Sequence, residues 1–212
     1  MVRAAVAGLV TALTCLPALM MSAKLPGTVW VMWPLLYWCA LMLWAFVFAW
    51  HFEYSGRPVF QTAFKPKLWL GATAYALAAG VLYSLFVDPA LRRLVPAEYP
   101  AGINAWLVAC PFQILFAPLF ICFAPFAFFM RLTHRQTVAT SLTVVVSLFI
   151  AYLRLRMLPT LPPIHITGAL LVMRAVSGFL SVYFYLNGGA LLIWWVALLI
   201  QVRLLFEIVA AH

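Results

Sequence analysis

The sequence predicts an all-α, polytopic membrane protein built as a bundle of transmembrane helices. Hydrophobic residues fill 67% of the 212 positions, charged residues fill only 8%, and the mean hydropathy is +1.09. A soluble globule of this length could not bury so much apolar surface, so lipid has to be the solvent. The apolar runs also lack the in-and-out alternation of barrel strands, which leaves helices to satisfy the backbone amides.

Apolar runs of about 18 residues or more, separated by turn residues, define the spans. We predict seven, near residues 4–22, 28–50, 68–87, 103–130, 138–153, 166–186 and 190–210, within one membrane domain covering residues 1–212. The first span follows Arg3 and also resembles a signal peptide, but we expect it to be retained as an anchor. The short link from Asn187 to Gly189 makes the last two spans antiparallel neighbours.

Two spans carry a small residue at every fourth position: Ala4, Gly8 and Ala12 in the first, and Ala72, Ala76 and Gly80 in the third. Such stripes let backbones approach closely, so we interpret them as helix contacts. The second span is rich in tryptophan. We interpret its interior indoles, such as Trp38 and Trp44, as contacts with lipid or a partner subunit, with a pigment or quinone pocket as the alternative.

The fourth span contains three prolines, Pro111, Pro118 and Pro125, spaced by seven residues and therefore close to one helical face. Each proline removes an amide donor and crowds the preceding turn, so we predict a kinked or broken helix. Packing inside the bundle is one interpretation. The other is a broken helix that lines a cavity, because irregular backbone at membrane depth is found around cavities.

Most ionisable residues are predicted at or beyond the ends of spans, including the acids Glu53, Asp88 and Glu98 and the histidines His51, His134, His165 and His212. Arg174 lies well inside a span, and Arg203 and Glu207 lie in the second half of the last one. Arg203 and Glu207 are four residues apart, so we predict an ion pair between them, with Arg174 close enough to share the carboxylate.

No cofactor or metal site is predicted, although a bound lipid or pigment is left open. The four cysteines are dispersed through apolar helices without ligand spacing, so they are interpreted as small buried hydrophobes. The net charge of +9 comes from basic residues scattered at helix ends, which favours membrane lipids over nucleic acid as partners. The cluster Arg57, Lys65 and Lys67 favours a cytoplasmic N-terminus. We expect a bacterial inner (cytoplasmic) membrane.

The region 116–208 resembles the CAAX-protease and bacteriocin-processing family, the glutamic intramembrane proteases also called CPBP or Abi proteins. Residues 124–131 keep the proline and the arginine of the first family motif, with Phe126 and Ala127 where paired glutamates belong. Residues 147–153 follow the second motif, with Leu153 in place of histidine. The third motif follows residues 178–199, where only Ala197 or Leu198 stands at the second histidine.

The resemblance implies the protease fold without the activity, because Phe, Ala and Leu can neither accept a proton nor orient a water. Glu53 and Arg57 also have the glutamate-to-arginine spacing of the first motif, with His51 beside them. These three residues are the weak alternative as a catalytic site. The sequence thus favours a non-catalytic subunit, an accessory or scaffold protein of a larger membrane complex. The alternatives are a divergent intramembrane protease or lipid-modifying enzyme, and then a small transporter based on the fourth span and Arg174.

Overall fold

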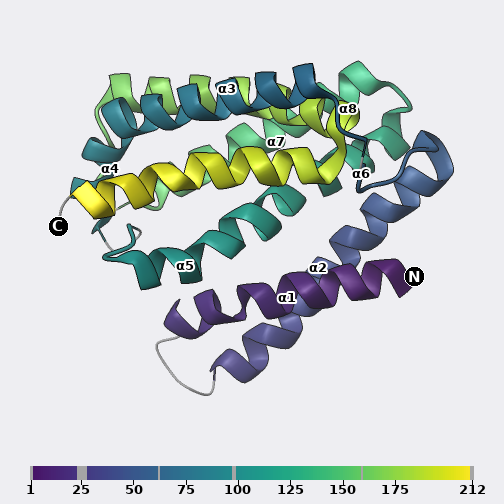
Figure 1. Ribbon diagram of the computed structural model, residues 1–212, viewed down its shortest axis with the longest axis horizontal. Coiled ribbons are helices and arrows are strands. Elements are labelled where there is room, and N and C mark those ends of the chain that lie inside the picture. The colour runs from purple at the N-terminus through teal and green to yellow at the C-terminus, as the bar shows by residue number, and fades with distance from the viewer. Residues whose placement is uncertain (1, 23–27, 62, 97–98, 159, 211–212) are drawn as a thin grey trace.

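The computed structural model describes residues 2–22, 28–61, 63–96, 99–158 and 160–210, and these form helices and connecting turns without a strand (Figure 1). Six of the described helical stretches are long and apolar enough to cross a membrane. The predicted all-α transmembrane bundle is therefore confirmed, and the chain is an integral membrane protein. Glu98 and His212 lie outside the described residues.

The first two helices, α1 (Val2–Ser22) and α2 (Thr28–Trp50), pack against each other along one edge of the bundle (Figure 1). The small residues of α1 face this contact. A side-chain carbon at Gly8 would lie 3.0 Å from the backbone of Leu41, and Ala4 and Ala12 are buried. The predicted helix contact is confirmed for this stripe, because only a residue without a side chain lets the backbones come so close.

The third span is longer than predicted. It begins as α3 (Pro66–Leu82), widens into a π-helical turn (Tyr83–Val87) and continues as α4 (Asp88–Leu94). The stripe Ala72, Ala76 and Gly80 is buried, and α3 packs on α8, as the stripe predicted. The sequence analysis placed the end of this span near residue 87, directly before Asp88 and Pro89. Proline is tolerated in the first turn of a helix, so the chain continues.

The fourth span is irregular rather than broken. It runs from α5 (Ile103–Pro111) through two π-helical turns, Phe112–Phe116 and Leu119–Phe123, into α6 (Ala124–Thr133). Each π-helical turn ends two residues before a proline, Pro118 or Pro125. The wider turn gives the proline ring room beside the preceding backbone, so the span remains helical through its three prolines while its α-helical pattern is interrupted twice. The predicted break is not observed, and π-helical turns beside prolines are the features that accompany a kink.

The last spans are α7 (Gln136–Arg156) and α8 (Ile164–Ala210). The helical pattern of α8 is interrupted at Gly189, whose backbone (φ 73°, ψ −172°) is accessible to glycine but not to residues with a side chain. Tyr75 of α3 donates a hydrogen bond to Ser177, and Trp195 donates one to Thr73. Both halves of α8 therefore lie beside the same part of α3, as expected for an antiparallel hairpin reversed at Gly189.

The core lies where α2, α6 and the reversal of α8 meet. Trp44, Phe123, Phe126 and Tyr185 are fully buried there, and the rings of Phe123 and Tyr185 stack with centroids 4.6 Å apart. The N-terminus, the end of α2 and the end of α6 lie at one end of the bundle, whereas α4 and the C-terminal end of α8 lie at the other (Figure 1). These two ends hold the candidate sites.

Candidate functional site

The end of the bundle at α4 is held by ion pairs, and we call Asp88, Arg92, Tyr99, Arg203 and Glu207 the paired end. Asp88 is the most buried carboxylate among the described residues. It accepts hydrogen bonds from Arg203, from Nε at 2.8 Å and from Nη2 at 3.2 Å, and from the Tyr99 hydroxyl at 3.0 Å. Burial and the adjacent Asp88 carboxylate raise the pKa of Tyr99 well above its ordinary value, so the phenol remains a donor at neutral pH.

The carboxylate of Glu207 pairs with Arg92 of α4, not with Arg203. The predicted ion pair between Arg203 and Glu207 is thus corrected, because each of them forms its ion pair with a residue of the third span, Asp88 or Arg92. Both arginines also lie over aromatic rings, Arg92 at 5.0 Å from the centroid of Tyr99 and Arg203 at 4.9 Å from that of Tyr83. Each guanidinium thus makes a cation–π contact in addition to its ion pair.

Arg174 does not share the carboxylate of Glu207, which corrects the second part of that prediction. Its Nε atom is buried and makes no hydrogen bond with a described residue. The ion pairs of Asp88, Glu53 and Glu207 are made with other arginines. Burying a charged arginine inside a membrane span costs free energy unless a partner stabilises it, so Arg174 stays a candidate functional residue.

At the opposite end, a π-helical turn (His51–Ser55) continues α2 and buries the ring of His51. Nδ1 lies 2.9 Å from the backbone carbonyl of Arg57, which can only accept, so Nδ1 carries a proton and donates it. Nε2 lies 2.9 Å from the hydroxyl of Tyr185. Glu53 faces away and pairs with Arg131 at 3.3 Å on the exposed surface. The structure therefore does not bring His51 and Glu53 together.

Two cations cap the first half of α8 at this end. Arg57 donates from Nη1 to the carbonyl of Leu186 at 3.1 Å, and Lys65 donates from Nζ to the carbonyl of Asn187 at 2.9 Å. The last carbonyls of a helix have no partners within it and carry the negative end of its dipole. The two side chains thus satisfy backbone groups that the reversal at Gly189 leaves open.

A cavity of about 790 Å³ opens at the same end, between α1, the end of α2 and the segment 56–60. Its wall is mostly apolar, with Phe48, Phe60 and Trp194 among the lining side chains. Its charged lining residues are Arg3 and Arg57, and its other polar side-chain groups belong to Thr11, Trp44, His51 and Trp194. The volume suits one small organic molecule or one lipid chain. None of Pro111, Pro118 and Pro125 lines it, but Leu115, from the π-helical turn between Pro111 and Pro118, does, so the irregular fourth span contributes to the cavity wall.

The two tryptophans predicted as partner or pigment contacts have different environments. Trp44 is only 1% exposed, and its indole nitrogen donates to the hydroxyl of Thr11 at 3.0 Å, so its assignment to an outward contact is corrected. The sequence could not separate it from the others, because every residue around it is apolar. Trp38 is 57% exposed on the outer face of α2 and makes no hydrogen bond with a described residue.

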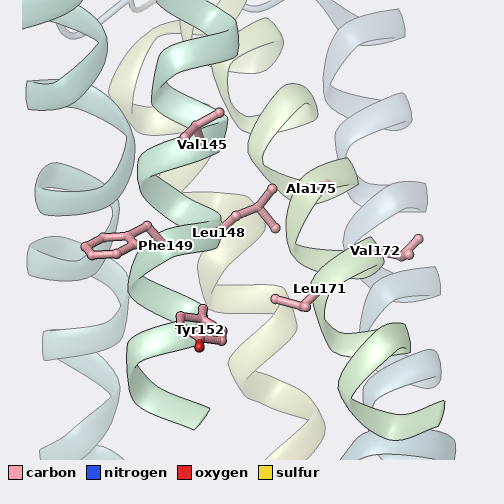
Figure 2. Close-up of a pocket in the computed structure, with 7 residues that line it drawn as sticks. All are labelled: Val145, Leu148, Phe149, Tyr152, Leu171, Val172 and Ala175. Carbon is pink, nitrogen blue, oxygen red and sulfur yellow. The ribbon is translucent and has the colours of Figure 1, made fainter. Parts of the chain in front are cut away.

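A second cavity, of about 490 Å³, is an open groove between α7 and the first half of α8. Leu148 of α7 and Leu171 of α8 point into the space between the helices, whereas the ring of Phe149 projects from the other side of α7 in this view (Figure 2). The lining is apolar apart from the hydroxyl of Tyr152. Such a groove is suited to hydrocarbon, but it holds no group that could orient a headgroup or carry out chemistry.

The positions that the family resemblance aligned with catalytic residues lie in different environments. Phe126 is fully buried against Trp50 and Tyr185, whereas Leu153 is 39% exposed. Because α6 and α7 are joined by a short turn, Leu153 lies roughly 15 Å farther from that turn than Phe126 does, at 1.5 Å per residue. Ala197 and Leu198 lie in the second half of α8, half-buried. Phe126 and Leu153 therefore do not lie together.

Sequence reasoning missed Asp88 and Arg3 as site residues. Asp88 was placed beyond the end of its span, and the proline that follows it was the signal that the helix continues. Arg3 was treated only as a flank of the first span. Among the described residues, no group of three His, Cys, Asp or Glu side chains could hold a metal ion.

Comparisons with protein-family models, with curated proteins and with solved structures each found no match to this chain. The fold and the contacts above therefore carry the functional argument by themselves. They establish an integral membrane protein with six apolar helical stretches, one end closed by ion pairs and the other containing a cavity with arginines among its lining residues.

Proposed function

We propose that this chain is a non-catalytic subunit of a membrane complex, and that it binds a partner helix through the outer face of α2. The observation that carries the proposal is the environment of Trp38. This residue lies near the middle of α2, about 15 Å along the helix from its start. Indoles prefer the headgroup level, where their N–H groups reach water, and Trp38 lies far from it.

The outward face around Trp38 is continuous. Val31, Leu35, Trp38 and Met42 follow each other at spacings of four, three and four residues and are all strongly exposed. This spacing is that of a helix-packing seam. Lipid chains would cover the apolar surface equally well, but they offer no acceptor to the indole N–H of Trp38. A partner helix with a hydroxyl or carbonyl at this depth would satisfy it.

The state of the acid–base groups supports a binding role over a catalytic one. Asp88 and Glu207 are each paired with an arginine, Glu53 is paired with Arg131, and both ring nitrogens of His51 are occupied. Groups held in this way serve structure, whereas a general base has to reach a substrate proton. A divergent protease or lipid-modifying enzyme, and a small transporter, have less support. The relation to the glutamic intramembrane proteases stays a prediction, as does residence in a bacterial inner membrane.

The test compares two tryptophans of the same helix. Trp38→Phe keeps the ring and removes the N–H group, and Trp30→Phe does the same at an 82% exposed position near the start of α2. We expect Trp38→Phe to reduce the recovery of partner subunits after mild detergent extraction by several-fold, with Trp30→Phe near the unsubstituted level, measured by quantitative mass spectrometry.

Equal recovery with both variants would contradict the role of Trp38. A purified chain that alone cleaves or modifies a lipid or peptide, with the activity lost in Glu53→Ala or His51→Ala, would overturn the non-catalytic assignment.

A further inference from the structure

The cavity between α1 and α2 changes in polarity along its depth. Arg3 lies in the first turn of α1 and Arg57 lies just beyond α2, so both guanidinium groups are at the same end of the bundle. Trp44 lies about 10 Å deeper than that end, six residues before the last residue of α2. The cavity thus has charge at its mouth and aromatic and aliphatic side chains inside.

The two arginines at the mouth retain free hydrogen-bond donors. Arg57 uses Nη1 to cap Leu186, which leaves Nε and Nη2 without a partner among the described residues. Arg3 makes no hydrogen bond or ion pair with a described residue, and both side chains are exposed. Guanidinium groups match phosphate oxygens in geometry and bind them through charge-assisted hydrogen bonds.

The other polar groups of the cavity are already satisfied, except the indole Nε1 of Trp194, which is buried and has no hydrogen-bond partner among the described residues. The hydroxyl of Thr11 donates to the carbonyl of Ala7 and accepts from Trp44, and both ring nitrogens of His51 have partners. No described carboxylate lines the cavity. The net positive charge of the mouth is therefore uncompensated, in contrast to that of Arg203 and Arg92 at the other end.

We propose that this cavity is a binding site for an anionic phospholipid, with the phosphate held between Arg3 and Arg57 and one acyl chain lying along Val6, Val10 and Phe48. Charge complementarity selects the anion, and the depth of the apolar part selects an amphiphile instead of a free ion. The site is separate from the outer face of α2, so this inference stands independently of the proposed subunit role.

The decisive experiment maps a photoreactive phosphatidylglycerol, with a diazirine on one acyl chain, on the full chain in mild detergent. We expect adducts on the cavity residues of α1 and α2. In Arg3→Gln/Arg57→Gln the yield should fall about tenfold or more, since each basic side chain near a lipid phosphate contributes several-fold in affinity. The matched control is Arg93→Gln/Arg156→Gln, which removes two exposed arginines at the opposite end and should retain the yield.

Three competitors distinguish the sources of the anion. Unlabelled phosphatidylglycerol should displace the probe, whereas phosphatidylcholine with the same chains and inorganic phosphate should not. Displacement by inorganic phosphate at equal concentration would show a free-anion site and overturn the lipid assignment. Adducts confined to the groove between α7 and α8, or equal loss in the two double variants, would overturn the site itself.

Discussion

The two ends of the bundle use the same residue type in opposite ways. At the paired end, Arg203 is held by a buried carboxylate and a tyrosine ring. At the cavity end, Arg57 is held by a single backbone carbonyl and Arg3 by no described residue. The chain has 13 basic residues and only 4 acidic ones, so most arginines cannot find a carboxylate. The positions of the four acidic residues therefore determine which arginines form ion pairs within the protein and which can still bind a ligand.

A buried ion pair, such as Asp88 with Arg203, and an exposed ion pair, such as Glu53 with Arg131, respond differently when one partner is removed. A buried charge that loses its partner stays desolvated, whereas an exposed one returns to water. Substitutions at the two ends should therefore differ in effect by several kcal/mol, and the following variants are arranged from the largest expected effect to the smallest.

Asp88→Ala should destabilise the protein by about 3–5 kcal/mol, because it leaves the guanidinium of Arg203 buried without its carboxylate. The free energy of unfolding in mixed micelles measures this. Replacing both partners, in Asp88→Leu/Arg203→Met, should restore much of the loss, since an apolar pair of similar volume avoids the buried charge. The exposed pair supplies the control: Glu53→Ala should cost about 0–1 kcal/mol. Similar costs at both ends would show that the ends do not differ.

Gly189→Ala should destabilise the reversal of α8 by about 1–3 kcal/mol from the backbone alone. A side-chain carbon there would also lie 2.8 Å from the carbonyl oxygen of Val59, which adds a clash with backbone. Gly71→Ala in α3 is the matched control, because a side chain at Gly71 meets nothing within 4 Å and alanine favours a helix. Thermal aggregation in detergent should place the two variants on opposite sides of the unsubstituted protein.

Trp44→Phe should cost about 1–3 kcal/mol, since the hydroxyl of Thr11 loses its buried donor and a gap opens at the base of the cavity. The same change at exposed Trp30 should alter stability by less than about 0.5 kcal/mol. Unfolding in mixed micelles compares the two directly. An equal effect would contradict the burial of Trp44 that separates it from the outward tryptophans of α2.

The sequence predicted the fold well because apolar runs, small-residue stripes and turn residues act locally. The contacts at Gly8, Ala72 and Ala76 depend on spacing along one helix, and so did the reversal near Asn187 and Gly189. For the fourth span, the sequence predicted that the helix is irregular but not the form of the irregularity. Its prolines signal strain, but a widened turn can absorb that strain without a break, and the sequence does not show which outcome prevails.

The candidate site was largely beyond sequence reasoning, because its partners are distant in the chain. Asp88 meets Arg203 across 115 positions, and His51 meets Tyr185 across 134. The predicted pairing of Arg203 with Glu207 used the only nearby acid, as local reasoning has to. Trp38 and Trp44 also have the same surroundings in sequence, and only the packing of α1 on α2 buries one and exposes the other.

The hydrogen bond from the amide of Ala190 to the carbonyl of Val59, 3.1 Å long, has a consequence for biosynthesis. Val59 leaves the ribosome well before Ala190, which follows 131 positions later in the chain. The carbonyl of Val59, in the connection after α2, therefore has no hydrogen bond from Ala190 until the reversal of α8 has formed. A chain halted before residue 190 would expose this unfinished loop together with unclosed apolar helix faces, which are the features that membrane quality control recognises in an incomplete product.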